Sequence, residues 1–163
     1  MTDNFIQLGK SGVLRFNIRT DEGVDTGEYL EFDMEDIELP LIYQEIGERL
    51  KKNQDKLKNQ LLIINKRQDV KGKKLLSKNQ EDEIRAVRDF VNEQVNIYNM
   101  FLGKNGVQKL LNGRKPTYEM FEYIDEIIEK QIMPHLNFNI ETIKDKIKNK
   151  YKKDNEEEIE VLE

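Results

Sequence analysis

The chain has 163 residues, a formal net charge of −5 and charged side chains at 36% of its positions. It contains no cysteine and a single histidine, His135, which removes disulfides, thiolate nucleophiles and Cys/His metal sites from its chemistry. No apolar run approaches the ~20 residues that cross a bilayer, so we expect neither a membrane protein nor a secreted one and take the cytoplasm as its default location.

Charge is unevenly distributed along the chain. Residues 1–40 hold ten acidic and three basic side chains, whereas residues 49–78 hold eleven basic and two acidic ones. The simplest interpretation is a solvated helix face followed by a charged loop. The alternative is self-association, in which the acidic end of one molecule meets the basic end of another. The basic residues that would take part are Lys51, Lys52, Lys56, Lys58, Lys66 and Arg67.

Residues 13–33 predict an antiparallel β-hairpin. Leu14, Phe16 and Ile18 alternate with polar residues, which is the pattern of a half-buried strand. Turn-forming residues fill positions 21–27, and the alternation then returns up to Phe32. A hairpin of two strands is only marginally stable alone, so we expect it to lie on a helix.

Two long amphipathic helices are predicted next, over residues 37–68 and 79–102. The first opens around Pro40, which a first helical turn tolerates, and its apolar residues recur every three or four positions. Residues 51–60 are almost entirely polar, so the helix either stands in solvent there or breaks. A loop follows over residues 69–78, and Ser77 with Gln80 fits the capping box that opens the second helix.

Three shorter helices complete the prediction. One covers residues 106–112, and the next covers 117–133, starting at Thr117 and stopping at Pro134. A weaker apolar repeat predicts a last helix over 140–151, and residues 154–163, which are strongly acidic, predict a disordered tail. The fold class is therefore mainly α (α+β), an N-terminal antiparallel β-hairpin packed on a bundle of about four to five helices in a single domain over residues 1–153.

None of the motif-like strings in the chain supports catalysis. Gly9-Lys10-Ser11 lacks the preceding glycine and the strand that a phosphate-binding loop requires. Gly103-Lys104-Asn105-Gly106 matches the clamp loop of an RNA-binding fold, but its flanks are helical. Asp125 and Glu129 lie one turn apart, a spacing met by chance on any charged helix. We therefore expect no enzyme, no catalytic residue, no cofactor and no metal.

The order of the elements resembles that of one protein family. An acidic hairpin leads into a basic amphipathic helix, and a second long helix ends at Phe101-Leu102-Gly103. A short helix from Gly106 is followed by the turn Gly113-Arg114 and by a helix rich in Phe and Ile. Over residues 13–136 this order resembles the tail assembly chaperones of long-tailed bacteriophages that infect Gram-positive bacteria.

The resemblance implies a protein that binds the long helical tape measure protein in the host cytoplasm and keeps it soluble during tail assembly. Family members recruit tail tube subunits and do not enter the finished virion. They are often made in two lengths by a programmed ribosomal frameshift, and an acidic end such as residues 154–163 is compatible with the short, non-frameshifted product. The implied partners are therefore the tape measure protein, the tail tube protein and a longer form of the chain itself.

Aromatic and methionine side chains of the later helices are the predicted contacts with client helices. Methionine adapts its shape, and tyrosine can keep one end in water. Each of these residues could instead belong to the core, because apolar stripes of helices normally face inward. The residues are Tyr98, Met100, Phe101, Tyr118, Met120 and Tyr123.

Two other functions stay open at this point. One is a structural protein of the particle, such as a scaffold or a connector between head and tail, which would be found in purified virions. The other is a nucleic-acid-binding regulator that uses residues 51–78. The negative net charge and the lack of interleaved aromatic residues in that stretch disfavour the regulator.

Overall fold

A β-hairpin precedes the helices in this computed structural model, which describes residues 12–136 and residue 148. Strand β1 (Val13–Arg19) pairs antiparallel with β2 (Asp25–Asp33), and the register shifts between Asn17 and Arg19. The second strand begins earlier than its alternation predicts, because the Thr26 hydroxyl donates a hydrogen bond to the Ile18 carbonyl across the pair. The predicted hairpin over residues 13–33 is confirmed.

The hairpin buries one face against the helices. Leu30 and Phe32 are almost fully buried, and the Phe32 ring lies 5.2 Å from that of Phe101. On the opposite face, Tyr29 is partly exposed beneath the guanidinium of Arg15, 4.0 Å from its ring centroid. The predicted fold class, a mainly helical α+β protein with its hairpin packed on helices, is confirmed.

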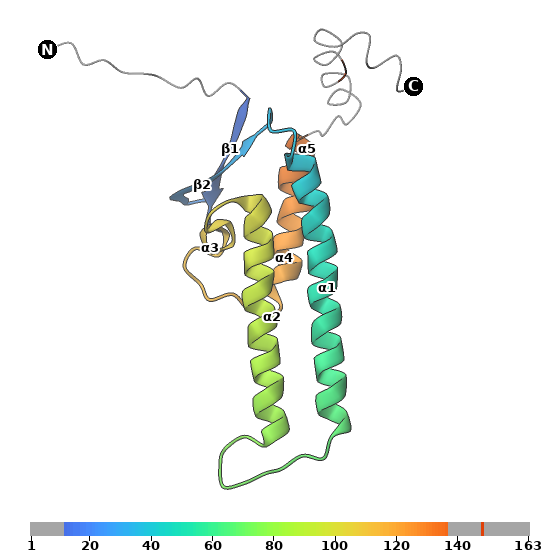
Figure 1. The fold of residues 1–163 in the computed structure, drawn as a ribbon. Coiled ribbons are helices and arrows are strands. Elements are labelled where there is room, and N and C mark those ends of the chain that lie inside the picture. The colour runs from blue at the N-terminus through green and yellow to red at the C-terminus, as the bar shows by residue number, and fades with distance from the viewer. Residues whose placement is uncertain (1–11, 137–147, 149–163) are drawn as a thin grey trace, which may run out of the picture.

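Helices α1 (Leu39–Lys66) and α2 (Lys78–Leu102) run antiparallel side by side and form a long helical hairpin (Figure 1). The polar middle of α1 does not break the helix. Its residues stand in solvent except for Leu57 and Asn53, which face α2. The Asn53 side-chain amide donates to the Phe90 carbonyl at 3.1 Å and to the Gln94 side-chain oxygen at 2.9 Å, which satisfies two buried polar groups.

The connection between the two long helices ends at the predicted capping box. The Gln80 amide donates to the Ser77 hydroxyl at 3.2 Å, and the Ser77 amide donates to the Gln80 side chain at 2.9 Å. Arg67, just after α1, bonds to Asn79 and pairs with Asp82 of α2. These contacts join the end of α1 to the start of α2, and both helices lie within two residues of their predicted bounds.

A short helix and a third helical segment follow. Helix α3 (Gly106–Leu110) is shorter than predicted, because Leu111 to Gly113 form a turn. Helix α4 (Met120–Ile127), the π-helical turn η1 (Ile128–Ile132) and α5 (Met133–Leu136) then follow without a break. We call these three together the third helical segment.

Both predicted ends of the third helical segment, 117 and 133, are wrong. Residues 118 and 119 form a turn before the helix begins, and the Thr117 carbonyl accepts the hydrogen bond that closes this turn. At the other end, Pro134 does not stop the helix. It lies directly after the π-helical turn η1, inside a helical run that continues to Leu136. The predicted helix over 140–151 and the tail over 154–163 lie outside the described residues, except for Lys148.

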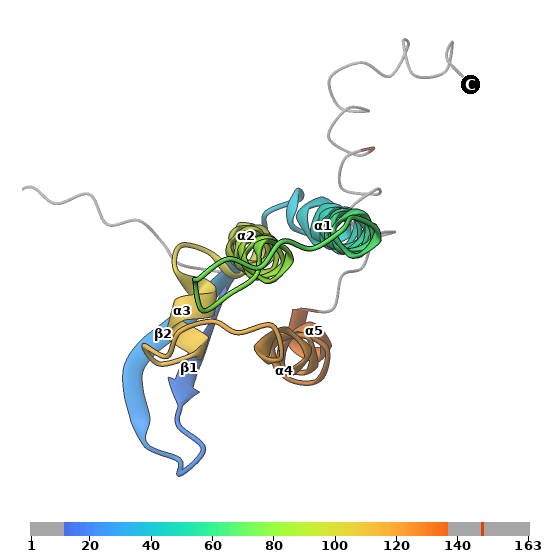
Figure 2. The same cartoon turned by 90° about the horizontal axis from the view of Figure 1, so that it is seen from below.

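The described elements form two layers, seen along the helices in Figure 2. Helices α1 and α2 make one layer. The β-hairpin, α3 and the third helical segment all lie on the same side of it, with Phe121 of α4 packed on Phe90 and stacked on Tyr98. No described helix or strand covers the opposite face of α1 and α2.

Candidate functional site

An apolar groove runs between α1 and α2 near the end of the helical hairpin that carries the connecting loop. Its volume is about 470 Å³, and we call it the distal groove. Ile84 in its wall is 55% exposed, although Ile84 and Val87 belong to an apolar stripe that repeats along α2 with the helical period. The lining residues are Leu61, Asn65, Glu83, Ile84 and Val87.

The distal groove is open because the third helical segment is shorter than the helices on which it packs. The segment covers only the half of α1 and α2 that lies nearer the β-hairpin (Figure 1). Its covering ends at Tyr118, whose ring lies 5.5 Å from that of Phe90, one helical turn after Val87. Beyond that point, among the described elements, α1 and α2 contact only each other. No described helix therefore covers Leu61, Ile84 and Val87.

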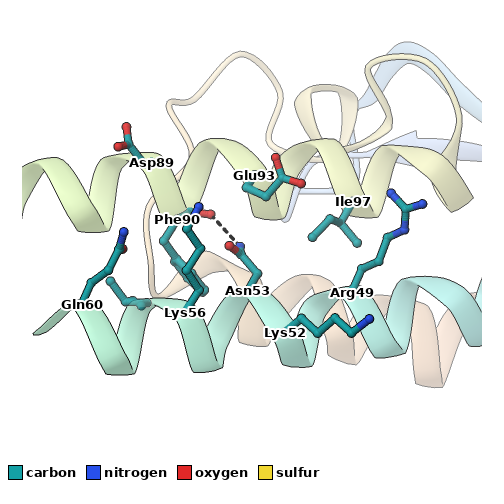
Figure 3. Close-up of a pocket in the computed structure, with 10 residues that line it drawn as sticks. Arg49, Lys52, Asn53, Lys56, Gln60, Asp89, Phe90, Glu93 and Ile97 are labelled. Atoms are coloured by element: carbon teal, nitrogen blue, oxygen red, sulfur yellow. Dashed lines mark hydrogen bonds between the residues drawn. The ribbon is translucent and has the colours of Figure 1, made fainter. Parts of the chain in front are cut away.

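A second, larger groove lies on the opposite face of the helical hairpin and is strongly charged (Figure 3). Its volume is about 700 Å³, and we call it the charged groove. The α1 wall carries three bases, Arg49, Lys52 and Lys56, whereas the α2 wall carries two acids, Asp89 and Glu93. The floor between the walls is largely apolar and consists of Asn53, Leu57, Phe90 and Ile97.

The opposite charges of the two walls are not joined across the charged groove. Arg49 pairs with Glu45 on its own helix at 2.7 Å, and Asp89 pairs with its neighbour Arg88 at 3.1 Å. Within the described part of the chain, Lys52 and Lys56 make no ion pair. The groove therefore presents a basic wall and an acidic wall to whatever lies on it.

Two of the predicted client-contacting residues lie in the core. Tyr98 and Phe101 are 2% and 4% exposed, and the Phe101 ring packs 5.2 Å from the rings of both Phe32 and Tyr43. The Tyr98 hydroxyl donates to Asp125 of α4. These two side chains hold the layers together and cannot reach a client from the folded chain.

The other four predicted contacts do not form one patch. Tyr118 is exposed and contacts the ring of Phe90, and Met120 is partly buried against the core. Tyr123 is exposed and lines a separate cleft between β1 and the third helical segment. Met100 is exposed on α2 and lies seven residues after Glu93, which places it on the side of the charged groove.

The predicted self-association residues also divide between faces. Lys52 and Lys56 line the charged groove, whereas the helical period turns Lys51 and Lys58 toward the other flank of α1. Arg67 is engaged with Asn79 and Asp82, and Lys66 is exposed at the end of α1. The acids that face Lys52 and Lys56 within the molecule are those of α2, not those of residues 1–40.

Sequence reasoning missed both grooves, although one signal for each was present. The two long helices are predicted to be longer than any later helix, so part of their apolar stripe had to remain uncovered. Asp89 and Glu93 lie four residues apart on α2, as Lys52 and Lys56 do on α1, which marks a single-charge row on each helix. Without the pairing of α1 with α2, the two rows could not be placed opposite each other.

Titratable groups with raised pKa values lie where the third helical segment packs on the two long helices. Burial raises the pKa of the Asp125 carboxyl above its ordinary value, the Tyr98 hydrogen bond opposes this rise, and the nearby carboxylates of Glu129 and Glu122 add to it. Burial between the helices also raises the pKa of Tyr98 and of Tyr43. These groups belong to the packing between layers and lie apart from both grooves.

The described residues contain no cluster of three or more histidine, aspartate or glutamate side chains placed to hold a metal ion. In the same part of the chain, no helix has both the length and the apolar character needed to span a bilayer.

Comparisons with protein-family models, with curated proteins and with solved structures gave no significant match.

Proposed function

We propose that this chain is a tail assembly chaperone of long-tailed bacteriophages of Gram-positive hosts, in its short form, and that it binds the tape measure protein and keeps it soluble during tail assembly. It would act in the host cytoplasm without catalysis and would be absent from the mature virion. The tail tube protein and a longer frameshifted form of the chain would be further partners. The proposal draws on the resemblance of residues 13–136 to this family and on the distal groove.

The observation that carries the proposal is the half-covered face of the helical hairpin. The third helical segment already shows how a helix packs there, because Phe121 of α4 lies on the rings of Phe90 and Tyr98 of α2. A client helix in the distal groove would continue the same packing, with its apolar stripe on Leu61, Ile84 and Val87. An amphipathic helix of an unassembled tape measure protein needs such a cover, because exposed apolar faces aggregate.

The chemistry of the distal groove suits reversible binding. Asn65 and Glu83 line the groove and keep it compatible with water when it is empty, while Tyr118, on the ring of Phe90 one turn beyond Val87, adds an exposed aromatic side chain. Lys58, three residues before Leu61, is exposed beside the groove. We therefore expect the preferred client to be an amphipathic helix with acidic residues on the Lys58 side of its apolar stripe and basic residues on the Glu83 side.

The test is co-expression of the chain with successive segments of the tape measure protein encoded by the same genome, followed by capture and assay of segment solubility. The wild-type chain should retain at least one helical segment that precipitates alone. Ile84→Glu should lower the affinity for that segment about tenfold or more, since burial of an isoleucine contributes ~1.5–3 kcal/mol. Leu75→Glu makes the same change in polarity at a 91% exposed position outside the groove and should leave capture unchanged.

Other outcomes would redirect the function. If the wild-type chain retains no segment and is instead found in purified particles, a scaffold or connector role replaces the chaperone. If it binds nucleic acid with an affinity that falls steeply as salt rises, a regulator role replaces it. If Ile84→Glu and Leu75→Glu capture equally well, the client does not use the distal groove.

A further inference from the structure

We propose that the charged groove is a self-complementary interface, through which two copies of this chain pair around a twofold axis parallel to α1 and α2. The bare face of the helical hairpin and the order of charges on it support this pairing. It does not depend on the chaperone function.

No described helix or strand lies on the face that carries the charged groove. Figure 2 shows the β-hairpin, α3 and the third helical segment gathered on the other side of α1 and α2. A second copy approaching the bare face would therefore meet only α1 and α2 among the described elements. The distal groove opens on the far side of the helical hairpin, so the same molecule could hold a client helix at the same time.

The charges on the bare face are arranged in two rows of opposite sign. Arg49, Lys52 and Lys56 form the row on α1, and Asp89 and Glu93 form the row on α2 at the same level of the helical hairpin (Figure 3). Since Lys52 and Lys56 make no ion pair with a described residue, they remain available to a partner. A surface of this kind is complementary to a copy of itself if the two rows exchange places.

Symmetry decides which arrangement exchanges the rows. A twofold axis parallel to the helices places α1 of one copy opposite α2 of the other at the same height. Lys52 and Lys56 then face the acids of the second copy, and the same contacts are repeated on the other side of the axis. An axis across the helices would instead place α1 opposite α1, so that bases would face bases. Repulsion between like charges disfavours that second arrangement.

The pairing should be weak and sensitive to salt. Ion pairs at an exposed surface contribute only ~0.2–1 kcal/mol each and are screened as the ionic strength rises. Apolar support comes from the groove floor at Leu57 and Ile97 and from Met100, which is 39% exposed on the same face. The interface is thus expected to form at high local concentration, as when several copies coat one long client.

Charge reversal tests the pairing in the full chain. Sedimentation equilibrium of the wild-type chain should give a monomer–dimer equilibrium at low salt that shifts toward monomer at high salt. The double variants Lys52→Glu/Lys56→Glu and Asp89→Lys/Glu93→Lys should each weaken dimerisation at least tenfold, because each leaves like charges opposed. The quadruple variant that combines them should return to within a few fold of the wild type. Lys51→Glu/Lys58→Glu makes the same change in net charge away from the groove and serves as the control.

Cross-linking tests the axis, and the natural absence of cysteine keeps the readout clean. A mixture of the single variants Lys56→Cys and Asp89→Cys should form a disulfide-linked dimer faster than either variant alone, because the parallel axis brings these positions together. Faster self-linking of Lys56→Cys would overturn this axis. The interface itself would be overturned if the wild-type chain stayed monomeric at low salt up to millimolar concentration. It would also be overturned if both double variants dimerised as well as the wild type.

Discussion

At the scale of single residues, one buried amide pair ties the two long helices in register. Asn53 lies in an otherwise polar stretch of α1 and bonds to Gln94 and to the Phe90 carbonyl. If α1 slid along α2, these groups would be buried without partners, at a cost of roughly 1–3 kcal/mol each. The pair therefore favours the observed register over its neighbours, and this register also sets the two charged rows opposite each other.

Protonation of Asp125 should change the free energy of unfolding of this protein. Its pKa is raised in the folded protein, so the folded state binds the proton more tightly than the unfolded state does. The contribution of this group to stability therefore improves as the pH falls through the raised pKa and is complete below the unfolded-state value of about 3.9. The Tyr98 hydrogen bond can be kept by an amide oxygen, which makes Asp125→Asn the informative variant.

We expect the stability of Asp125→Asn, measured relative to the wild type by urea unfolding, to be higher at pH 7 than at pH 4.5. Asp82 has the opposite sign, because its hydrogen bond from Arg67 lowers its pKa and its contribution is lost in acid. Asp82 is present in both proteins, so its effect cancels in the difference. A relative stability that stays constant or rises on acidification would contradict the assigned direction for Asp125.

At the scale of elements, the corner between α2 and α3 depends on glycine for two different reasons. Gly103 ends α2 with a φ of 92°, in the region that glycine tolerates best. Gly106 begins α3 with an ordinary backbone but packs so closely on Leu102 that a Cβ atom would collide with its side chain. The Gly-x-x-Gly string is thus the means by which a long helix turns back on itself.

Two glycine substitutions should therefore change stability in opposite directions. Gly106→Ala should lower the free energy of unfolding by about 1–3 kcal/mol, as overpacking does in a close-packed interior. Gly47→Ala, in the middle of α1 where nothing lies near the added methyl group, should raise it by about 0.5–1 kcal/mol, since alanine is the better helix former. Urea unfolding of both variants checks this, and equal effects at the two positions would mean that the corner is not closely packed.

At the scale of the whole molecule, the third helical segment is shorter than α1 and α2. The described elements therefore form two layers along only half the length of these two helices. Near the β-hairpin, α1 and α2 are covered by α3, the two strands and the third helical segment. Toward the connecting loop no other described helix or strand covers them, and Leu57, Ile64, Ala86 and the capping box at Ser77 hold the pair together. Local stability should follow this division, because it depends on the number of apolar contacts around each hydrogen bond.

Hydrogen exchange should show that division. In the free chain, amides of residues 58–66 and 80–88 should exchange sooner than those of residues 42–50 and 94–102. Occupation of the distal groove should then slow exchange in the first two stretches far more than in the last two. Uniform exchange along both helices would contradict the partition, whereas uniform protection on adding a client segment would contradict binding at the distal groove.

The amino-acid sequence specified the helices and strands, because turn residues, caps and apolar periodicity act locally. The hairpin over 13–33, the two long helices and the capping box at Ser77 followed from these signals. It failed at Pro134, where a proline predicted to end the helix instead occupies the first turn of α5 after a π-helical turn.

Which apolar side chains are covered depends instead on how the elements pack on one another. Tyr98 and Ile84 both lie on the apolar stripe of α2, yet Tyr98 is buried under the third helical segment and Ile84 is exposed beyond its end. Likewise, the charged rows of α1 and α2 lie opposite each other only once the helices are antiparallel and in register. Burial and charge complementarity are relations between distant segments, and the local pattern of a chain does not specify how far one helix extends along another.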